Sequence, residues 1–265
     1  MQVGSRVLRD AGALRERLDQ LDAPHVAPLN AYVRNLRNRL GGDHVPWFDP
    51  ASAGVDAEVL LLLEAPGARS VSTDGLRARP GSGIISPDND DMTAANTTRL
   101  RDAAGLDRTR LLHWNAIPWY IGDGTTIRPA NEADRREALP ELRTLLALLP
   151  KLRVVVTMGR AAQIIWAMHV QKESTGVVAV PALHPSPRSM NRWPDAWQRA
   201  QLSMVSARAV LDATAAPTGV RPPLGLLPGE DAGHAGGGPR SAARCRVPLG
   251  TQRRCNLPSG QTAVP

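Results

Sequence analysis

Aromatic residues and cysteines are scarce in this chain of 265 residues. Six Trp, two Tyr and one Phe leave aliphatic side chains and alanine to build the core. The only two cysteines, Cys245 and Cys255, lie near the C-terminus. Two cysteines exclude an iron–sulfur cluster held by four cysteines and the usual zinc ribbons. A disulfide between them is disfavoured in a reducing compartment.

Long apolar runs are also missing from the sequence. No run approaches the ~20 residues that a bilayer span requires, and the N-terminal residues MQVGSRVLRD lack the apolar core of a secretion signal. We therefore expect a soluble, cytoplasmic protein with no membrane partner. We expect no metal and no cofactor either, because four histidines lack metal-ligand spacing to carboxylates or cysteines: His25, His44, His169 and His234.

Positive charge is in excess and is unevenly distributed. The chain has 32 basic and 25 acidic residues, a net charge of +7, and such an excess favours polyanionic partners such as nucleic acid. More than half of it falls in residues 213–265, where Gly, Pro, Ala and Arg dominate and hydrophobic periodicity is absent. This composition predicts a disordered basic tail.

Short apolar runs alternate with amphipathic segments before the tail. Buried strands are predicted at residues 58–63, 111–117, 153–158 and 177–183. Helices are predicted at residues 93–104, 131–149, about 160–168 and 195–212, with two more in the first forty residues. This alternation indicates an α/β fold, a three-layer α/β/α sandwich with a central four-stranded parallel sheet. We expect residues 1–44 to supply helices that pack on a domain over residues 45–212.

Polar residues stand where three of the predicted strands end: Glu64, Asn115 and His184. Ligands of open α/β sheets bind beyond the carboxyl ends of the strands. Taken singly, the histidine is explained by a structural role and the asparagine by a turn, but a carboxylate next to an apolar strand must be solvated or paired. Together the three predict a site. His113 alternates away from Trp114 along its strand, and we expect it to face a covering helix.

Three motifs carry these residues: Leu-Glu-Ala-Pro-Gly at 63–67, Asn-Ala-Ile-Pro-Trp-Tyr at 115–120 and His-Pro-Ser-Pro-Arg-Ser at 184–189. In this order they resemble the uracil-DNA glycosylase superfamily over about residues 45–212, specifically the prokaryotic branches whose first motif reads Glu-Ala-Pro-Gly, here without the iron–sulfur cysteines. The resemblance implies a monomeric DNA-repair hydrolase that needs no cofactor. It would cleave the N-glycosidic bond of uracil, or a related deaminated base, and leave an abasic site.

The resemblance also assigns roles within these motifs. His184 would donate a hydrogen bond to uracil O2 and stabilise the departing anion. Asn115 would read the polar edge of the base, because one amide offers both a donor and an acceptor. Backbone amides after Glu64, in the turn with Ala65 and Gly67, would hold the base or a flanking phosphate.

Two departures from the superfamily pattern affect catalysis and base binding. Ala65 occupies the position of the water-activating Asp of the best-characterised branch, so Glu64 either activates the water or orients the loop. Ile84 lies in the segment where related enzymes carry an aromatic, so an aliphatic side chain would cover the uracil. Four loop acids are either solvated charges or alternative carboxylates for the reaction: Asp74, Asp88, Asp90 and Asp91.

The resemblance places the loop that enters the DNA minor groove after His184. It includes Ser186, Arg188, Met190, Asn191 and Arg192. Met190 would wedge into the base stack and the arginines would contact phosphates. The alternative is a solvated loop that leads into the last helix.

Two other functions are weighed against a glycosylase. Ala65 and Ile84 favour a catalytically weak protein that binds uracil or a lesion without turning it over. An unrelated α/β hydrolase would need a nucleophile, but Ser186 has no Gly-x-Ser-x-Gly elbow around it.

Overall fold

A parallel four-stranded sheet is the centre of the fold, in the order β4-β2-β5-β6. The computed structural model describes residues 6–42, 44–71, 81–123, 126–173 and 176–215, all within one compact unit, Met1–Gly219. The strands are β2 (Val59–Leu63), β4 (Leu111–Asn115), β5 (Val154–Met158) and β6 (Val178–Ala182). Each is an apolar run of the kind that parallel strands need when both faces of the sheet are covered.

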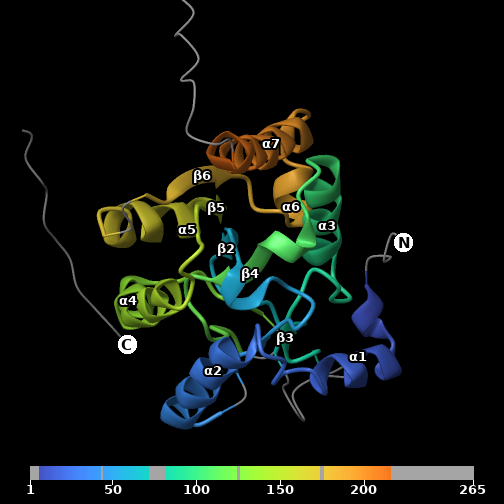
Figure 1. Ribbon diagram of the computed structural model, residues 1–265, viewed down its shortest axis with the longest axis vertical. Coiled ribbons are helices and arrows are strands. Elements are labelled where there is room, and N and C mark those ends of the chain that lie inside the picture. The colour runs from blue at the N-terminus through green and yellow to red at the C-terminus, as the bar shows by residue number, and fades with distance from the viewer. Residues whose placement is uncertain (1–5, 43, 72–80, 124–125, 174–175, 216–265) are drawn as a thin grey trace, which may run out of the picture. The chain divides into compact units, whose positions relative to one another are not determined.

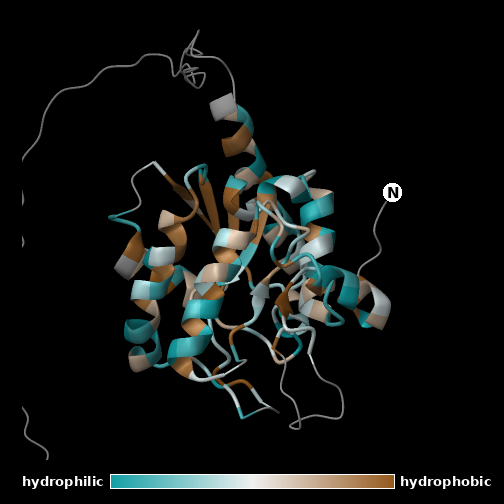
Figure 2. Ribbon diagram, turned by 60° about the horizontal axis from the view of Figure 1, so that its bottom comes forward, coloured by the Kyte–Doolittle hydropathy of each residue, from teal (hydrophilic) through white to brown (hydrophobic). Residues whose placement is uncertain are grey.

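Helices cover both faces of this sheet (Figure 1). On one face lie α2 (Ala27–Leu40), α4 (Glu132–Ala147) and α5 (Arg160–Ile165). On the other lie α3 (Met92–Ala103), α6 (Pro187–Met190) and α7 (Ala196–Ala215). The predicted α/β/α sandwich with a four-stranded parallel sheet is confirmed. Figure 2 shows apolar colour along the strands and polar colour on much of the helices.

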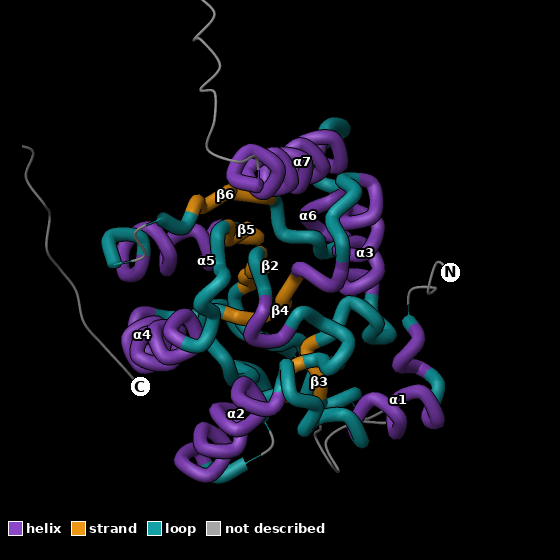
Figure 3. The backbone as a smooth tube through the Cα atoms, viewed as in Figure 1, coloured by secondary structure: helices purple, strands orange, loops and turns teal. Residues whose placement is uncertain are grey.

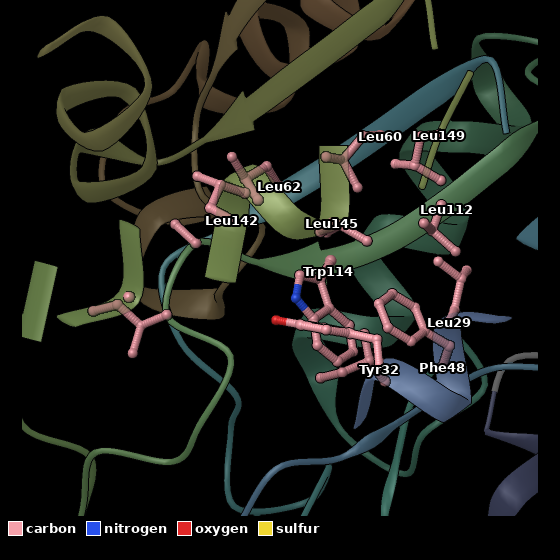
Figure 4. Packing of buried hydrophobic residues seen from close by; sticks show 14 of the residues in the cluster. Leu29, Tyr32, Phe48, Leu60, Leu62, Leu112, Trp114, Leu142, Leu145 and Leu149 are labelled. Atoms are coloured by element: carbon pink, nitrogen blue, oxygen red, sulfur yellow. The ribbon is translucent and has the colours of Figure 1, made fainter. Parts of the chain in front are cut away.

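Successive residues of each strand alternate between two hydrophobic clusters, because side chains of a strand point to opposite faces. Leu60 and Leu62 belong to the cluster under α2 and α4, whereas Leu61 belongs to the one under α3 and α7. In the first cluster Phe48 and Trp114 stack with ring centroids 3.7 Å apart (Figure 4). Tyr32, Trp119 and Trp166 belong to the same cluster, so five of the nine aromatic residues pack on this face of the sheet.

A second, smaller sheet was not predicted. The strands β1 (Trp47–Phe48) and β3 (Ile84–Ile85) pair in parallel, and Figure 3 shows β3 apart from the main sheet. Two-residue strands leave no readable periodicity in a sequence. The remaining elements are η1 (Val7–Arg9), α1 (Ala11–Leu18), η2 (Gly54–Asp56), η3 (Arg108–Arg110) and the π-helical turn Trp166–Val170.

A buried ion-pair network fastens the segment that contains β3. Arg17 lies 2.6 Å from Asp49 and 3.2 Å from Asp88, and Arg108 lies 2.7 Å from Asp49 and 2.8 Å from Asp88. The two carboxylates are almost fully buried. Burial opposes ionisation of Asp88, but Arg108 and Arg17 together hold its pKa below the usual range. The reading of Asp88 as a solvated loop charge is therefore wrong.

The last helix ends later than the sequence predicts. Helix α7 runs to Ala215, past the predicted boundary at residue 212, and the rest of the predicted tail lies outside the described residues. None of the helices described is long and apolar enough to span a bilayer.

Candidate active site

The three polar strand ends meet around one cavity of about 590 Å³, here called the strand-end cavity. Glu64 follows β2, Asn115 ends β4, and His184 comes two residues after β6. Because the strands are parallel, their carboxyl ends lie at the same edge of the sheet, and all three side chains line the cavity. Other lining residues come from β3, from the segments before and after it, and from α3: Arg69, Ile85, Asp91, Ala94 and Thr97.

The ring of His184 is held in one tautomer. The backbone N–H of Ser186 donates to Nδ1 at 3.1 Å, so Nδ1 accepts and the proton of the neutral ring sits on Nε2. Burial lowers the pKa of His184, which keeps the ring neutral. Gly159 (φ 93°) lies directly against it, since an added Cβ would be 3.0 Å from the His184 Cβ. His184 is therefore a fixed, neutral N–H donor.

The loop around His184 is anchored by side chains on two helices. Asn96 of α3 donates from Nδ2 to the Pro185 carbonyl at 2.7 Å. Gln163 of α5 donates to the Ala182 carbonyl at 2.8 Å. Ser186 caps α6 by accepting a hydrogen bond from the Ser189 backbone. These contacts position the imidazole without touching the ring.

Asn115 is 3 % exposed and lines the strand-end cavity. Among the described residues, none is hydrogen-bonded to its side-chain amide. Its amide atoms are not among the buried side-chain atoms without a partner, so the amide faces the cavity, where a ligand can supply both an acceptor and a donor to it.

Glu64 is tied to the loop that leads into α4. The backbone N–H of Ala130 donates to Oε1 at 3.0 Å, and the Glu64 carbonyl accepts from the Ile117 backbone. Within the described part of the chain, Oε2 makes no hydrogen bond. The contact with Ala130 supports the loop-orienting alternative for Glu64.

A family model described as the uracil DNA glycosylase superfamily matches residues 52–202. The chain belongs to the uracil-DNA glycosylase superfamily. The match includes all four strands of the main sheet and the loops that carry Glu64, Asn115 and His184. Membership indicates a DNA glycosylase of base excision repair. No curated protein matches the sequence.

Two residues expected in the site of this uracil-DNA glycosylase superfamily member lie elsewhere. Ile84 is fully buried, and its neighbour Ile85 lines the strand-end cavity instead. The expectation was off by one residue in a strand, which moves the side chain to the opposite face. Met190 is 2 % exposed and packs in the cluster under α7, so its predicted role as a wedge in DNA is wrong.

The remaining predicted residues are placed as follows. Ala65 and Gly67 line the strand-end cavity, and a Cβ added to Gly67 would meet no described atom within 4 Å. Ser186 and Arg188 line it as well, whereas Asn191 and Arg192 are exposed beyond α6. Their contacts with a base or with DNA stay predictions.

Asp91 is a site residue that sequence reasoning left unassigned. Its Oδ1 accepts from the Ala94 backbone at 2.8 Å, which caps α3, and the residue lines the strand-end cavity. Burial raises the pKa of Asp91. An Asp before a helix signals a cap in the sequence, but only the fold brings it to the cavity. Asp90 lies 3.7 Å from Arg6 outside this cavity, and Asp74 lies outside the described residues.

His113 is a second imidazole in the wall of the strand-end cavity. It lies on the same face of β4 as Asn115, toward α3 as expected, but it also lines the cavity. Its Nε2 is buried and makes no hydrogen bond within the described residues. Within these residues, no cluster of three or more His, Cys, Asp or Glu is placed to hold a metal ion.

We expect the free energy of unfolding to fall as the pH drops below about 6.5, in part because of His113. Burial, with the nearby Arg108 charge, lowers the pKa of His113 from 6.5 to about 3. Below pH 6.5 the unfolded chain binds a proton that the folded chain excludes, so stability decreases by about 1.4 kcal/mol per pH unit. Urea unfolding of the wild type and His113→Leu between pH 7 and 5 measures this slope. An equal slope in both proteins would contradict the assignment.

Proposed function

We propose that this protein is a uracil-DNA glycosylase. It hydrolyses the N-glycosidic bond of uracil, or of a related deaminated base, in DNA and leaves an abasic site. The observation that carries the proposal is the pairing in one cavity of a neutral imidazole donor, His184, with the unpartnered amide of Asn115.

The chemistry requires a donor where negative charge develops. Hydrolysis breaks the bond between C1′ of the deoxyribose and N1 of uracil, and the bonding electrons leave with the base. A water oxygen bonds to C1′, and the proton of that water finally neutralises the base. His184 Nε2–H donates to uracil O2 as the charge gathers there, and a fixed donor costs no reorganisation at that moment.

The amide of Asn115 selects the base. Uracil presents an N–H donor beside a carbonyl acceptor, which matches the acceptor and the donor of one carboxamide. Cytosine presents the opposite pattern at that edge and pairs only with an amide rotated by 180°. The base reaches this amide only after it is extruded from the helix, at a cost of a few kcal/mol.

Two carboxylates are candidates for positioning the water. Glu64 has one oxygen engaged by Ala130 and the other without a described partner, and Asp91 has one oxygen engaged by Ala94. If neither acts, leaving-group stabilisation by His184 carries the reaction.

A second candidate function is uracil-selective binding with little turnover. The engagement of Glu64 by Ala130, together with Ala65 at the position of the activating Asp, favours it. Both candidates share the pocket and differ in base release.

The test is single-turnover release of the base from a uracil-containing oligonucleotide, followed by cleavage of the abasic site. We expect product from the wild type, at least tenfold slower release by Asn115→Ala, as the loss of hydrogen bonds to the base predicts, and slower release from a matched cytosine strand than from uracil. Hypoxanthine and xanthine strands define the base range. Uracil-selective binding without release would decide for the second candidate. The absence of both base release and uracil-selective binding would refute both candidates.

A further inference from the structure

An exposed tryptophan follows the short helix at the mouth of the strand-end cavity. Trp193 is 40 % exposed and lies in the connection between α6 and α7. It lies five positions after Arg188, which lines the cavity. The chain between them spans at most about 18 Å, which is about five steps of one DNA strand at 3.4 Å each.

Two arginines flank the Trp193 ring. The guanidinium carbon of Arg192 lies 4.6 Å from the ring centroid and that of Arg199 lies 5.5 Å away. Both arginines are exposed, and neither forms an ion pair with a described carboxylate. The result is an aromatic ring at the surface, edged by uncompensated positive charge.

Three tryptophans have low exposure and are explained by packing in the core, whereas the exposed Trp193 is not. Trp114, Trp166 and Trp119 are 1 %, 2 % and 8 % exposed. Protein interfaces are also enriched in aromatic residues and arginine, but the family model covers this part of the chain, within residues 52–202, and DNA is the substrate of the proposed function. Aromatic rings in a positive groove are the usual platform for the bases of nucleic acids.

We propose that Trp193 stacks on a base of the DNA strand beside the extruded nucleotide, while Arg192 and Arg199 contact the phosphates on either side. The proposal rests on the proposed function for the presence of DNA at this face.

The experiment compares Trp193→Ala, Trp193→Phe and the control Leu202→Ala, which removes another exposed apolar side chain, 58 % exposed on α7. Fluorescence anisotropy measures the Kd for a duplex with a stable abasic-site analogue, across a salt titration. We expect Trp193→Ala to weaken binding roughly tenfold, as for the loss of one stacked base, Trp193→Phe to recover part of it, and Leu202→Ala to match the wild type.

Salt dependence separates stacking from charge. Stacking of an uncharged ring on a base releases no counterions from the DNA. Trp193→Ala should therefore keep the wild-type slope of log K against log salt concentration. Arg192→Ala and Arg199→Ala should each reduce that slope by about one. A 2-aminopurine base placed beside the lesion should show a fluorescence change with the wild type that Trp193→Ala loses.

Wild-type affinity of Trp193→Ala, or an equal loss in Leu202→Ala, would overturn the proposal. The assay measures DNA binding and does not depend on base release. Failure of the stacking proposal is therefore distinguishable from failure of the proposed glycosylase function. DNA binding that depends on Trp193 without uracil release leaves this inference standing and removes the glycosylase.

Discussion

His184→Ala is expected to slow uracil release about 10²- to 10³-fold, the usual effect of removing one fixed donor to a developing anion. The ring is held by the Ser186 N–H at Nδ1 and by the backbone of Gly159 at its side. Alanine removes the donor and the ring acceptor of the Ser186 N–H, but Asn96 and Gln163 still hold the Pro185 and Ala182 carbonyls, so the loop and its affinity for DNA should change little. Single-turnover rates at saturating enzyme measure the chemical step separately from binding.

Matched variants make this result specific to the donor. His184→Gln keeps a side-chain N–H and should recover part of the rate. His25→Gln replaces a histidine that bonds to the Pro50 carbonyl and does not line the strand-end cavity, so it should react at the wild-type rate. A His184→Ala rate within threefold of the wild type would refute leaving-group stabilisation by this ring.

The pH dependence of the same step tests the neutral tautomer. Burial lowers the pKa of His184, and protonation would place a hydrogen on Nδ1 where it now accepts from Ser186. The wild-type rate should therefore persist as the pH falls through 6.5 and decline only at lower pH. A rate that rises on acidification through 6.5 would indicate a charged imidazole instead.

The strands, the main helices and the meeting of three polar side chains could all be predicted from the sequence. Parallel strands that are buried on both faces have continuous apolar sequences. The sheet brings their carboxyl ends to the same edge, independently of the conformation of the loops. Glu64, Asn115 and His184 follow from that rule alone.

The features that could not be predicted from the sequence depend on contacts between segments that are distant along the chain. The choice of Ile85 over Ile84 is set by the pairing of β3 with β1, and the burial of Met190 by the position of α6 against α7. His113 has the local pattern of a core residue, and only the cavity beside α3 makes it a wall of the site. Asp88 reads as a loop charge until Arg17 and Arg108 are brought to it from segments far along the chain.

Asp88→Ala is expected to lower the free energy of unfolding by about 3–5 kcal/mol, because removal of one partner from a buried ion pair leaves an uncompensated charge. Arg108 would retain Asp49 and the Ala51 carbonyl, but two guanidinium groups would then share one carboxylate. Urea unfolding gives the difference. The control Asp212→Ala breaks an exposed pair with Arg208 and should cost at most about 1 kcal/mol. A cost for Asp88→Ala no larger than the control's would show that the network is not stabilising.

The same variant should also impair uracil release, because the network holds the segment between β3 and α3. That segment supplies Ile85 and Asp91 to the wall of the strand-end cavity.

The pH dependence of stability distinguishes Asp88 from His113. The pKa of Asp88 is lowered, so its contribution to stability is full above the ordinary value of 3.8 and is lost only as the pH falls through the lower folded value. His113 destabilises the fold from pH 6.5 downward. Asp88→Ala should therefore keep the wild-type slope of stability between pH 7 and 5, and His113→Leu should not.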